Sequence, residues 1–466
     1  MLMVKNSKLI GSILSVGILS FLGIVIETAL NIAFPQLMTE FNISARTVQW
    51  LTTGYMLVST IIIPFGSYLQ KRFKAVSLFR IAVLCFLLGT FLAGISSSFT
   101  LLLFGRLLQG VAAGIGLPLM FSIILRESPQ KQVGMFMGLG TLVIAFAPAV
   151  GPVYGGIVLK LFQWQNLFLF IIPVIILIWV LGEFSITQTT KTEKIPFDFQ
   201  GGLLLIAFLL SALFVLLGFT SGNNIYLQLI LALITIITGF FFILVEKHSQ
   251  HAVLKVSLFK NWQFTFFLLA FFLLQLMSLS MSFLIPNVLQ TAFAQTTATA
   301  GLLVLPAAIT DAVVSAFAGI IYDKVNQKLP IILGVVIILL TFIIANFLNP
   351  NITNMAFIYI SFMFGLGFSY GNIMTFCLSH IPTDVKNDGN VIFMTAQSYS
   401  GAIGTALAAS LITLAQTGFK NKKLAALAGL KLNYNMLVFL SLIVLVCILV
   451  CFIFTKSKSN ASQNLF

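Results

Sequence analysis

Long runs of apolar residues fill most of the chain, and short polar segments separate them. A helix needs about 20 apolar residues to cross the hydrocarbon core of a bilayer, and fourteen runs reach roughly this length. The pattern predicts an all-helical (all-α) polytopic membrane protein whose fourteen spans are grouped as six, two and six. The first six spans are predicted at 9–36, 47–69, 76–95, 100–125, 133–160 and 166–184. The middle two are predicted at 199–219 and 225–245, and the last six at 262–290, 299–322, 329–348, 354–379, 390–416 and 434–454.

Two polar segments, Gln188 to Lys194 and Glu246 to Lys260, divide the groups. We expect an N-terminal six-helix bundle in residues 1–187, two additional transmembrane helices with cytoplasmic linkers in residues 188–260, and a C-terminal six-helix bundle in residues 261–466. A short basic turn after Gly66 is echoed after Gly319 in the last six spans. Repeated halves are typical of transporters, which bind substrate near the midplane between two bundles.

Composition agrees with a membrane protein. Hydrophobic residues make up 59% of the 466 residues and charged residues 8%, whereas a soluble domain carries roughly 25% charged residues. So few charges cannot cover a surface that faces water. This excludes a soluble enzyme, a disordered scaffold and a secreted disulfide-bonded module. The four cysteines fall inside apolar runs without metal-site or disulfide spacing, so no metal site is predicted.

The net charge of +14 follows the predicted topology. With the N-terminus inside, eighteen Lys and Arg residues lie on the cytoplasmic side and six lie outside, and an excess of basic residues in short loops marks the cytoplasmic side. The split predicts that both termini are cytoplasmic. Its exception is the external segment Gln416 to Leu432, which holds four lysines. The basic charge therefore reflects topology, and no nucleic acid partner is expected.

Two acidic residues lie deep inside predicted spans: Glu27 in the first, and Asp311 in the second of the last six. A charge at that depth is unfavourable unless it is paired or faces water, so a functional carboxylate lining a cavity is the default interpretation. Arg106 in the fourth span lies at a depth similar to Glu27, with Gln109 one turn below it. We expect Glu27, Asp311 and Arg106 to couple transport to protons. A static Arg106–Glu27 pair that locks the bundle is the alternative.

Other polar residues within or at the ends of spans are not expected to couple transport to protons. Those within spans are expected either to orient substrate in a cavity or to hydrogen-bond between helices: Asn31, Gln109, Gln275, Asn287 and Asn372. Three acids are expected to be solvated where helices meet the cytoplasm: Glu183, Asp198 and Glu246.

The fifth span contains two prolines and three glycines between Ala147 and Gly156. In a membrane, neighbouring groups can satisfy the backbone carbonyls that proline frees, and glycines allow helices to approach closely. We expect a kinked, tightly packed helix suited to a gate or a leak-proof seam. Its gating or structural residues are Gly151, Pro152, Gly155 and Gly156.

Three motifs carry a family resemblance. The most specific is Gly151-Pro152-Val153-Tyr154-Gly155-Gly156, and the first span ends Glu27-Thr28-Ala29-Leu30-Asn31-Ile32-Ala33-Phe34-Pro35. The fourth span holds Arg106-Leu-Leu-Gln109-Gly110. These residues resemble the fourteen-span drug–proton antiporter branch of the major facilitator superfamily, whose first-span acid is Asp where this chain has Glu.

The resemblance implies the major facilitator fold, with two six-helix bundles plus two extra transmembrane helices. It implies multidrug efflux, and hence antibiotic resistance, by a proton-coupled antiporter in a bacterial cell membrane. The proton gradient would be the energy source, with no cofactor. The expected partners are a small lipophilic and cationic substrate, protons and the lipid bilayer, and the protein is expected to be a monomer.

The loop after the second span departs from the family pattern Gly-x-Leu-Ala-Asp-Arg-x-Gly-Arg. Here it reads Gly66-Ser-Tyr-Leu-Gln70-Lys71-Arg72-Phe73-Lys74, and Lys71 is assigned to the position of the acid. We therefore expect a weakened cytoplasmic gate in this half, with Gly66 and Arg72 as its gating residues. The echo in the other half retains an acid, Asp323.

Other functions remain as alternatives or are disfavoured. A proton-coupled exporter dedicated to one metabolite, such as a lipid, peptide, amino acid or siderophore, would carry the same motifs and stays open. A channel should show a filter or charged rings. An enzyme should show clustered catalytic groups, yet no span holds a histidine or paired acids, so no catalytic residue is predicted. An ATP-driven pump is disfavoured because the chain has no Gly-x-x-x-x-Gly-Lys-Ser/Thr segment.

Overall fold

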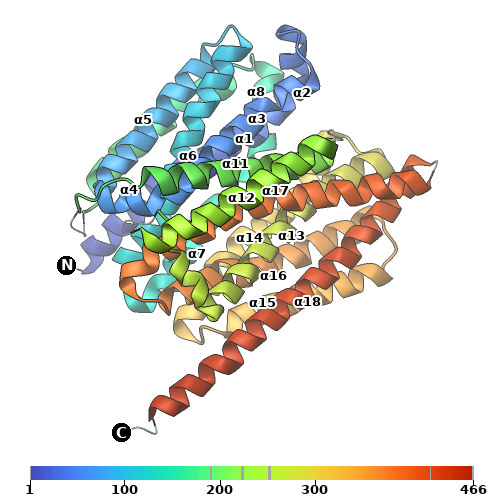
Figure 1. Cartoon of the computed structure of the whole chain (residues 1–466). Helices are drawn as coiled ribbons and strands as arrows, with labels where there is room; N and C mark the ends of the chain where they lie inside the picture. The colour runs from blue at the N-terminus through green and yellow to red at the C-terminus, as the bar shows by residue number, and fades with distance from the viewer. Residues whose placement is uncertain (1, 189–191, 222–224, 250–252, 420, 464–466) are drawn as a thin grey trace.

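The computed structural model describes residues 2–188, 192–221, 225–249, 253–419 and 421–463, which form helices and connecting turns without any strand. The N-terminal half is blue to cyan in Figure 1. Its elements are α1 (Leu2–Glu40), α2 (Ala45–Val48), α3 (Trp50–Ile62), η1 (Ile63–Phe65), α4 (Gly66–Arg72), α5 (Ala75–Gly94), α6 (Phe99–Glu127), η2 (Gln130–Gln132), α7 (Val133–Ala145), α8 (Ala147–Leu161), α9 (Asn166–Leu169) and α10 (Ile172–Ser185).

Three predicted spans of this half are interrupted, and the sixth is divided into α9 and α10 just before Pro173. The second is divided into α3, η1 and α4, with Pro64 in η1. The fifth is divided into α7 and α8 around Phe146, just before Pro148. Proline has no backbone N–H to donate and its ring crowds the preceding turn, which explains the breaks next to Pro64 and Pro148.

The C-terminal half, yellow to red in Figure 1, follows the η3 turn (Val256–Lys260). Its elements are α13 (Trp262–Phe293), α14 (Thr297–Lys324), α15 (Leu329–Phe347), α16 (Ile352–Ser379), η4 (Thr383–Val385), α17 (Lys386–Gly418) and α18 (Lys422–Gln463).

The two halves are built by the same packing scheme. In the N-terminal half α1 packs on α8, while α6 packs on α3 and α5. In the C-terminal half the equivalent helix α13 packs on α17, while α16 packs on α14 and α15. The halves meet where α14 packs on α7 and where α17 packs on α6 and η1. The domain boundaries at residues 187 and 260 stay a prediction.

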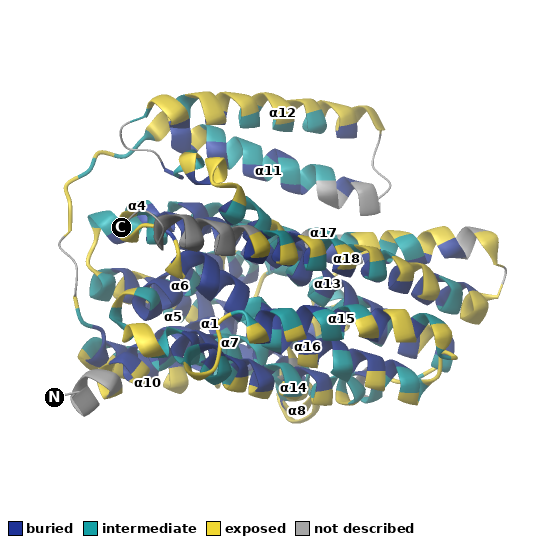
Figure 2. Ribbon diagram, turned by 90° about the horizontal axis from the view of Figure 1, so that it is seen from below, coloured by how far each residue is buried: buried dark blue, intermediate teal, exposed yellow. Residues whose placement is uncertain are grey.

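The two additional helices form a hairpin beside the halves, α11 (Phe199–Ser221) and α12 (Ile225–His248) (Figure 2). α11 packs on α17 and α3, and the Tyr399 hydroxyl of α17 donates a hydrogen bond to the Leu209 carbonyl of α11. α12 packs on α11 and η3, and its outer surface is exposed. That surface carries large apolar side chains such as Leu233, Ile236 and Phe240, which suit contact with lipid.

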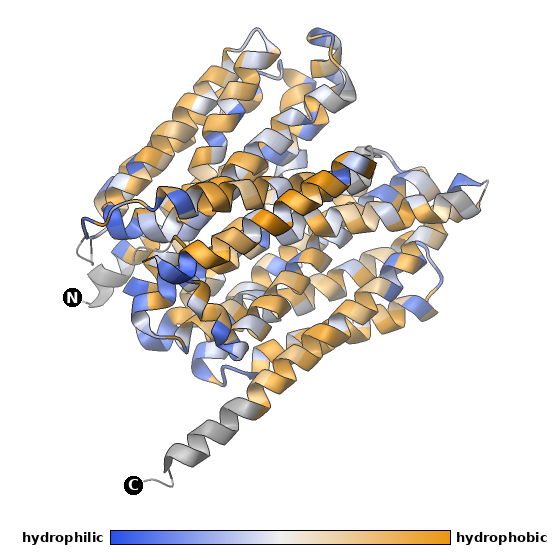
Figure 3. Cartoon of the chain, in the orientation of Figure 1, coloured by the Kyte–Doolittle hydropathy of each residue, from blue (hydrophilic) through white to orange (hydrophobic). Residues whose placement is uncertain are grey.

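Helix lengths confirm the prediction of an all-helical, fourteen-span membrane protein. Thirteen helices within the described residues are long and apolar enough to cross a membrane, and the remaining helix, α11, has an apolar stretch at Phe199–Val215. Figure 3 shows apolar residues along the middle of the helices and hydrophilic residues near their ends. α1 begins and α18 ends at the same end of the molecule (Figure 1), as an even number of spans requires.

Two local expectations are wrong. The external segment before the last span is short, because α17 ends at Gly418 and α18 begins at Lys422, well before the predicted start at 434. Glu246 is not solvated: it is buried in the last turn of α12, where its Oε1 accepts a hydrogen bond of 3.0 Å from the Val253 amide. The linker folds back over the carboxylate, which a hydropathy pattern cannot reveal.

Candidate transport site and cytoplasmic gate

Arg106 is the centre of a buried polar cluster in the N-terminal half. Its side chain on α6 is fully buried. Nε donates to the Leu51 carbonyl at 3.1 Å, and Nη1 donates to Gln109 Oε1 at 2.7 Å. Gln109 Nε2 in turn donates to Thr90 Oγ1 at 2.8 Å. The guanidinium also lies 4.3 Å from the ring centroid of Tyr55, a cation–π contact.

The Nη2 group of this arginine remains unused, since it is buried without a hydrogen-bond partner. A buried donor without a partner is unfavourable by about 1–3 kcal/mol. The cluster is therefore incomplete in this conformation, and an acceptor that reached Nη2 would stabilise it.

Glu27 lies next to this cluster without being bound into it. Its side chain on α1 is partly exposed. No ion pair within 4.0 Å joins it to Arg106 among the described residues, although the charge of Arg106 acts on it. α1 also passes close to Tyr55, because a Cβ atom at Gly23 would be 2.6 Å from the Tyr55 hydroxyl. Glu27 is thus within electrostatic reach of Arg106 and only partly covered by protein.

Asp311 occupies a separate site in the C-terminal half. It lies in the middle of α14 and is partly exposed, and Ser315 Oγ donates to its Oδ1 at 3.4 Å. Two tyrosines of α16, Tyr359 and Tyr370, lie within electrostatic reach of it. The Tyr370 ring stacks on Phe271 of α13 with ring centroids 4.2 Å apart, and its buried hydroxyl has no partner. Each half therefore holds a carboxyl inside a span near at least one tyrosine: Tyr55 near Glu27, and Tyr359 and Tyr370 near Asp311.

The residues predicted to line a substrate cavity lie in different surroundings. Asn31 is exposed, and its Oδ1 accepts from Thr52 Oγ1 at 3.2 Å. Gln275 and Asn287 on α13 are partly exposed. Gln109 is buried in the Arg106 cluster, and buried Asn372 donates to the Phe368 carbonyl of its own helix at 2.9 Å. Contact with substrate stays a prediction for all five.

The glycines of α8 let this helix approach α1 beside Glu27. A Cβ atom at Gly151 would overlap Thr28 Oγ1 and lie 2.8 Å from the Val25 carbonyl oxygen. A Cβ atom at Gly155 would lie 3.0 Å from both the Cα and the carbonyl oxygen of Ala29. Nothing lies within 4 Å of the same position at Gly156. Gly151 and Gly155 therefore form the close seam, and Pro152 lies between them within α8.

A gate between the halves closes the cytoplasmic side. Asp388, fully buried in the first turn of α17, accepts hydrogen bonds from Lys71 Nζ at 3.1 and 3.2 Å and from Ser67 Oγ at 2.5 Å. Both donors lie on α4, which begins at Gly66 and ends at Arg72. A Cβ atom at Gly66 would lie 3.1 Å from Val391 of α17, so the glycine allows this contact.

An equivalent gate lies between α14 and α7. Asp323 Oδ1 and Oδ2 accept from the Gly134 and Met135 amides at 2.9 and 2.7 Å. These amides belong to the first turn of α7, where N–H groups lack intrahelical partners and favour a negative charge.

Comparison of the two gates corrects the sequence alignment. Counted from Gly66 and Gly319, Asp323 corresponds to Gln70, and Lys71 corresponds to Lys324. The assignment of Lys71 to the acid position is therefore wrong by one residue. The acid is replaced by Gln70, which is buried with an unpartnered Oε1.

In the gate of α4 and α17 the carboxylate lies on the α17 side of the interface instead of the α4 side. The first turn of α17 carries Asp388, whereas the first turn of α7 carries no acid. Each gate thus holds one carboxylate, on the loop side in one and on the helix side in the other. Sequence analysis missed Asp388; the signal was an acid just before the span predicted at 390–416, in a chain whose loop after the second span lacks its usual acid.

Further hydrogen bonds at the cytoplasmic ends complete the closure. Asn387 Oδ1 accepts from Ser122 Oγ at 2.9 Å and from Arg126 Nε at 3.1 Å, and Asn390 Nδ2 donates to the Pro118 carbonyl at 2.9 Å. These bonds link α17 to α6. The conformation is therefore closed toward the cytoplasm.

A membrane protein with two repeated six-helix bundles, an acid inside each bundle and a gate at one end of their interface is a transporter that works between two bundles. The chain belongs to the Major Facilitator Superfamily, whose family model matches residues 16–405. It is a multi-pass protein of the bacterial plasma membrane and a transporter rather than an enzyme.

Two relatives and one solved structure are similar to this chain over most of its length. The chain is 31% identical over 425 residues to the lincomycin resistance protein LmrB of Bacillus subtilis, covering 88% of this chain and 87% of that protein. It is 23% identical over 418 residues to the multidrug export protein EmrB of Escherichia coli, covering 88% and 81%. The crystal structure of the human organic anion transporter MFSD10 matches its fold with a TM-score of 0.66 at 11% identity, covering 93% of this chain and 99% of that one.

Proposed function

We propose that this protein is a proton-coupled antiporter that exports lipophilic, cationic drugs or toxic compounds from the cytoplasm by alternating access. The observation that carries the proposal is the arrangement of Glu27 and Arg106. A carboxyl inside a span is partly exposed, and the buried guanidinium within electrostatic reach of it has no hydrogen-bond partner at Nη2. An acid inside a membrane span with a cationic partner within reach is suited to carry protons.

The proposed cycle moves Glu27 between two partners. In the cytoplasm-closed conformation the carboxyl takes up a proton from outside and does not need Arg106. After the cytoplasmic gates open, the carboxyl releases that proton inside, and its negative charge attracts either Arg106 Nη2 or a cationic substrate. Asp311 offers a second carboxyl for the same exchange in the other half. The proton gradient is the energy source, no cofactor takes part, and the unit of transport is the monomer.

The substrate class rests on two supports. Relatives over nearly the whole chain are named for lincomycin resistance and multidrug export, which favours drugs as substrates and antibiotic resistance as the outcome. Carboxyl groups inside the membrane spans favour cations among them, since a cation replaces the proton without leaving an unpaired charge.

The proposal is tested with purified protein in liposomes that enclose a pH-sensitive dye. The lumen is made acidic, and a panel of lipophilic cations is added outside. We expect cation-dependent alkalinisation of the lumen with the native chain and none with Glu27→Gln. If no cation produces a response, the proposal of multidrug antiport fails, and an exporter dedicated to one metabolite becomes the better explanation.

A further inference from the structure

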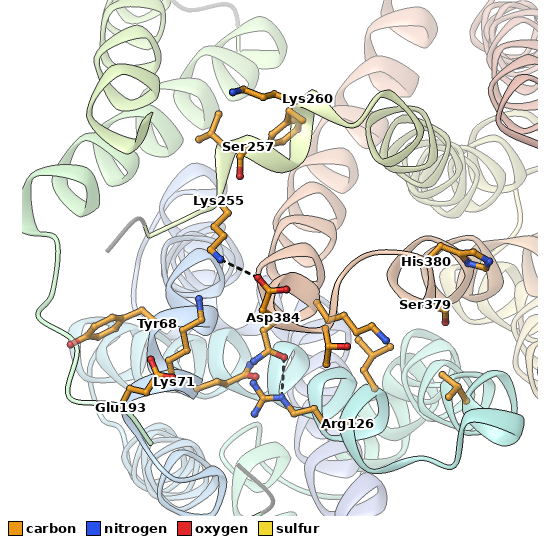
Figure 4. A pocket seen from close by; sticks show the side chains of 18 of the residues that line it. Tyr68, Lys71, Arg126, Glu193, Lys255, Ser257, Lys260, Ser379, His380 and Asp384 are labelled. Atoms are coloured by element: carbon orange, nitrogen blue, oxygen red, sulfur yellow. Dashed lines mark hydrogen bonds and ion pairs between the residues drawn. The ribbon is translucent and has the colours of Figure 1, made fainter. Parts of the chain in front are cut away.

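A large hollow on the cytoplasmic side adjoins the gate of α4 and α17 and lies apart from Glu27 and Asp311. Its volume is about 1670 Å³. We call it the cytoplasmic chamber. Its walls come from the cytoplasmic ends of α4 and α6, from η2, α12 and η3, and from the ends of α14, α16 and α17. In Figure 4, Lys71, Arg126 and Lys255 project toward it from different elements.

The charged side chains that line the chamber are mainly positive. Its lining holds seven Lys or Arg side chains against three carboxylates, an excess of four positive charges with His380 neutral. Two of the carboxylates are already engaged: Asp384 lies 3.8 Å from Lys255 Nζ, and Glu246 accepts from the Val253 amide. Four lysines of the lining have no acidic partner within 4.0 Å among the described residues: Lys131, Lys247, Lys260 and Lys386.

Topology alone does not explain this arrangement. An excess of lysine on the cytoplasmic side is expected of any membrane protein, and exposed Lys74 on that side is an ordinary example outside the chamber. The four lysines differ because they line one hollow and come from separate parts of the chain: Lys131 from the N-terminal half, Lys386 from the C-terminal half, and Lys247 and Lys260 from the segment between. Closure of the gates gathers like charges, which repel one another.

A buried donor adds a second observation. The hydroxyl of Ser128, at the end of α6, lines the chamber and is buried with no hydrogen-bond partner. A multivalent anion would offset the repulsion between the lysines, and it would accept a hydrogen bond from this hydroxyl once the Ser128 side chain rotated toward the hollow. Phosphate groups combine high charge with several strong acceptor oxygens, and basic hollows at the cytoplasmic ends of membrane helices suit lipid phosphates.

We propose that the cytoplasmic chamber is a binding site for a phosphate-bearing anion, held by Lys131, Lys260 and Lys386 from three parts of the chain. The anion is either a soluble phosphate compound or the headgroup of an anionic lipid. This site is separate from Glu27 and Asp311, so it stands whether or not the protein is a proton-coupled drug exporter.

The test uses the full chain, purified in detergent and stripped of lipid, with inorganic pyrophosphate as the soluble probe. Thermal unfolding is followed during titration and compared with potassium chloride at the same ionic strength. We expect a saturable rise in the unfolding temperature with pyrophosphate only. The variant Lys131→Gln with Lys386→Gln should bind about tenfold more weakly, since each exposed ion pair contributes up to about fivefold.

The control variant carries Lys74→Gln with Lys160→Gln, which removes two exposed lysines outside the chamber. It should bind pyrophosphate like the native chain. The lipid source is examined in nanodiscs of phosphatidylglycerol or phosphatidylcholine. If the phosphate belongs to a lipid, phosphatidylglycerol stabilises the native and control chains but not the chamber variant. The proposal is overturned if neither probe stabilises the native chain, or if the chamber and control variants respond alike.

Discussion

At the scale of single residues, Arg106 and Glu27 explain why charged side chains persist inside an apolar bundle. Arg106 is tolerated because its neighbours accept two of its N–H groups and Tyr55 covers its face. Glu27 is partly exposed and lies within electrostatic reach of the Arg106 charge, which makes a carboxylate less unfavourable there. The pair stays apart in the cytoplasm-closed conformation, which leaves each group free to change partner when the protein opens.

Replacement of Glu27 by Gln should abolish transport without affecting folding. Glutamine keeps the size of the side chain but cannot gain or lose a proton, so uphill export should fall to background. The amount of folded protein, followed by size-exclusion chromatography, should not change. Glu27→Asp is the matched control, since it retains the carboxyl and should keep part of the activity. Undiminished uphill export by Glu27→Gln would remove this residue from the coupling mechanism.

At the scale of elements, the seam between α1 and α8 depends on two glycines whose neighbours leave no space. Gly155 faces the backbone of Ala29, while the adjacent Gly156 faces open space. The two positions differ only in what surrounds them. They therefore offer a comparison in which helix propensity and side-chain volume are the same.

Gly155→Leu should obstruct the seam, and Gly156→Leu should not. Overpacking a tight contact is unfavourable by about 1–3 kcal/mol, and here it would force α8 away from α1 next to Glu27. We expect Gly155→Leu to abolish turnover in proteoliposomes at unchanged expression in the membrane, with near-native turnover for Gly156→Leu. Equal turnover of the two variants would show that close packing of this seam is not required.

The gates make a second comparison between elements, because their carboxylates lie on opposite sides of equivalent interfaces. Asp388→Asn should weaken the gate by about 1–3 kcal/mol, the range for a buried polar group that loses its partner. Gln70→Asp combined with Asp388→Asn returns the carboxylate to the side that Asp323 occupies in the other gate, and should restore closure.

The reporter for this prediction is a cysteine at Ser122, a buried position in the interface, in a chain whose four native cysteines are replaced by alanine. Its labelling by a membrane-impermeant thiol reagent, measured in inside-out vesicles, should rise with Asp388→Asn. It should rise as well with Gln70→Asp alone, which places two acids together. In the combined variant it should return toward the starting rate; continued fast labelling there would contradict the proposed exchange of the carboxylate.

At the scale of the whole molecule, the sequence predicts best what depends on length and polarity. Fourteen apolar runs predict the fourteen helices, and Pro148 lies where the fifth span breaks. It predicts poorly what depends on contacts between distant residues. Lys71 and Asp388 are 317 positions apart, and the sequence around either residue does not indicate that the two form an ion pair. Likewise Glu246 follows an apolar run and resembles a solvated helix end, until the linker residue Val253 returns to it.

Alternating access requires the cytoplasmic closure to open during each cycle, and a reversible cross-link tests this for the molecule as a whole. Ser122 and Asn387 lie in hydrogen-bond contact across the halves. In the cysteine-free chain, Ser122→Cys with Asn387→Cys should be joined by a short cleavable bis-thiosulfonate reagent. Export should then fall to background and recover after reduction, while each single cysteine variant treated in the same way should remain active. Export that continued through the cross-link would mean that α6 and α17 need not separate, and that substrate reaches the carboxyl groups by a path other than this interface.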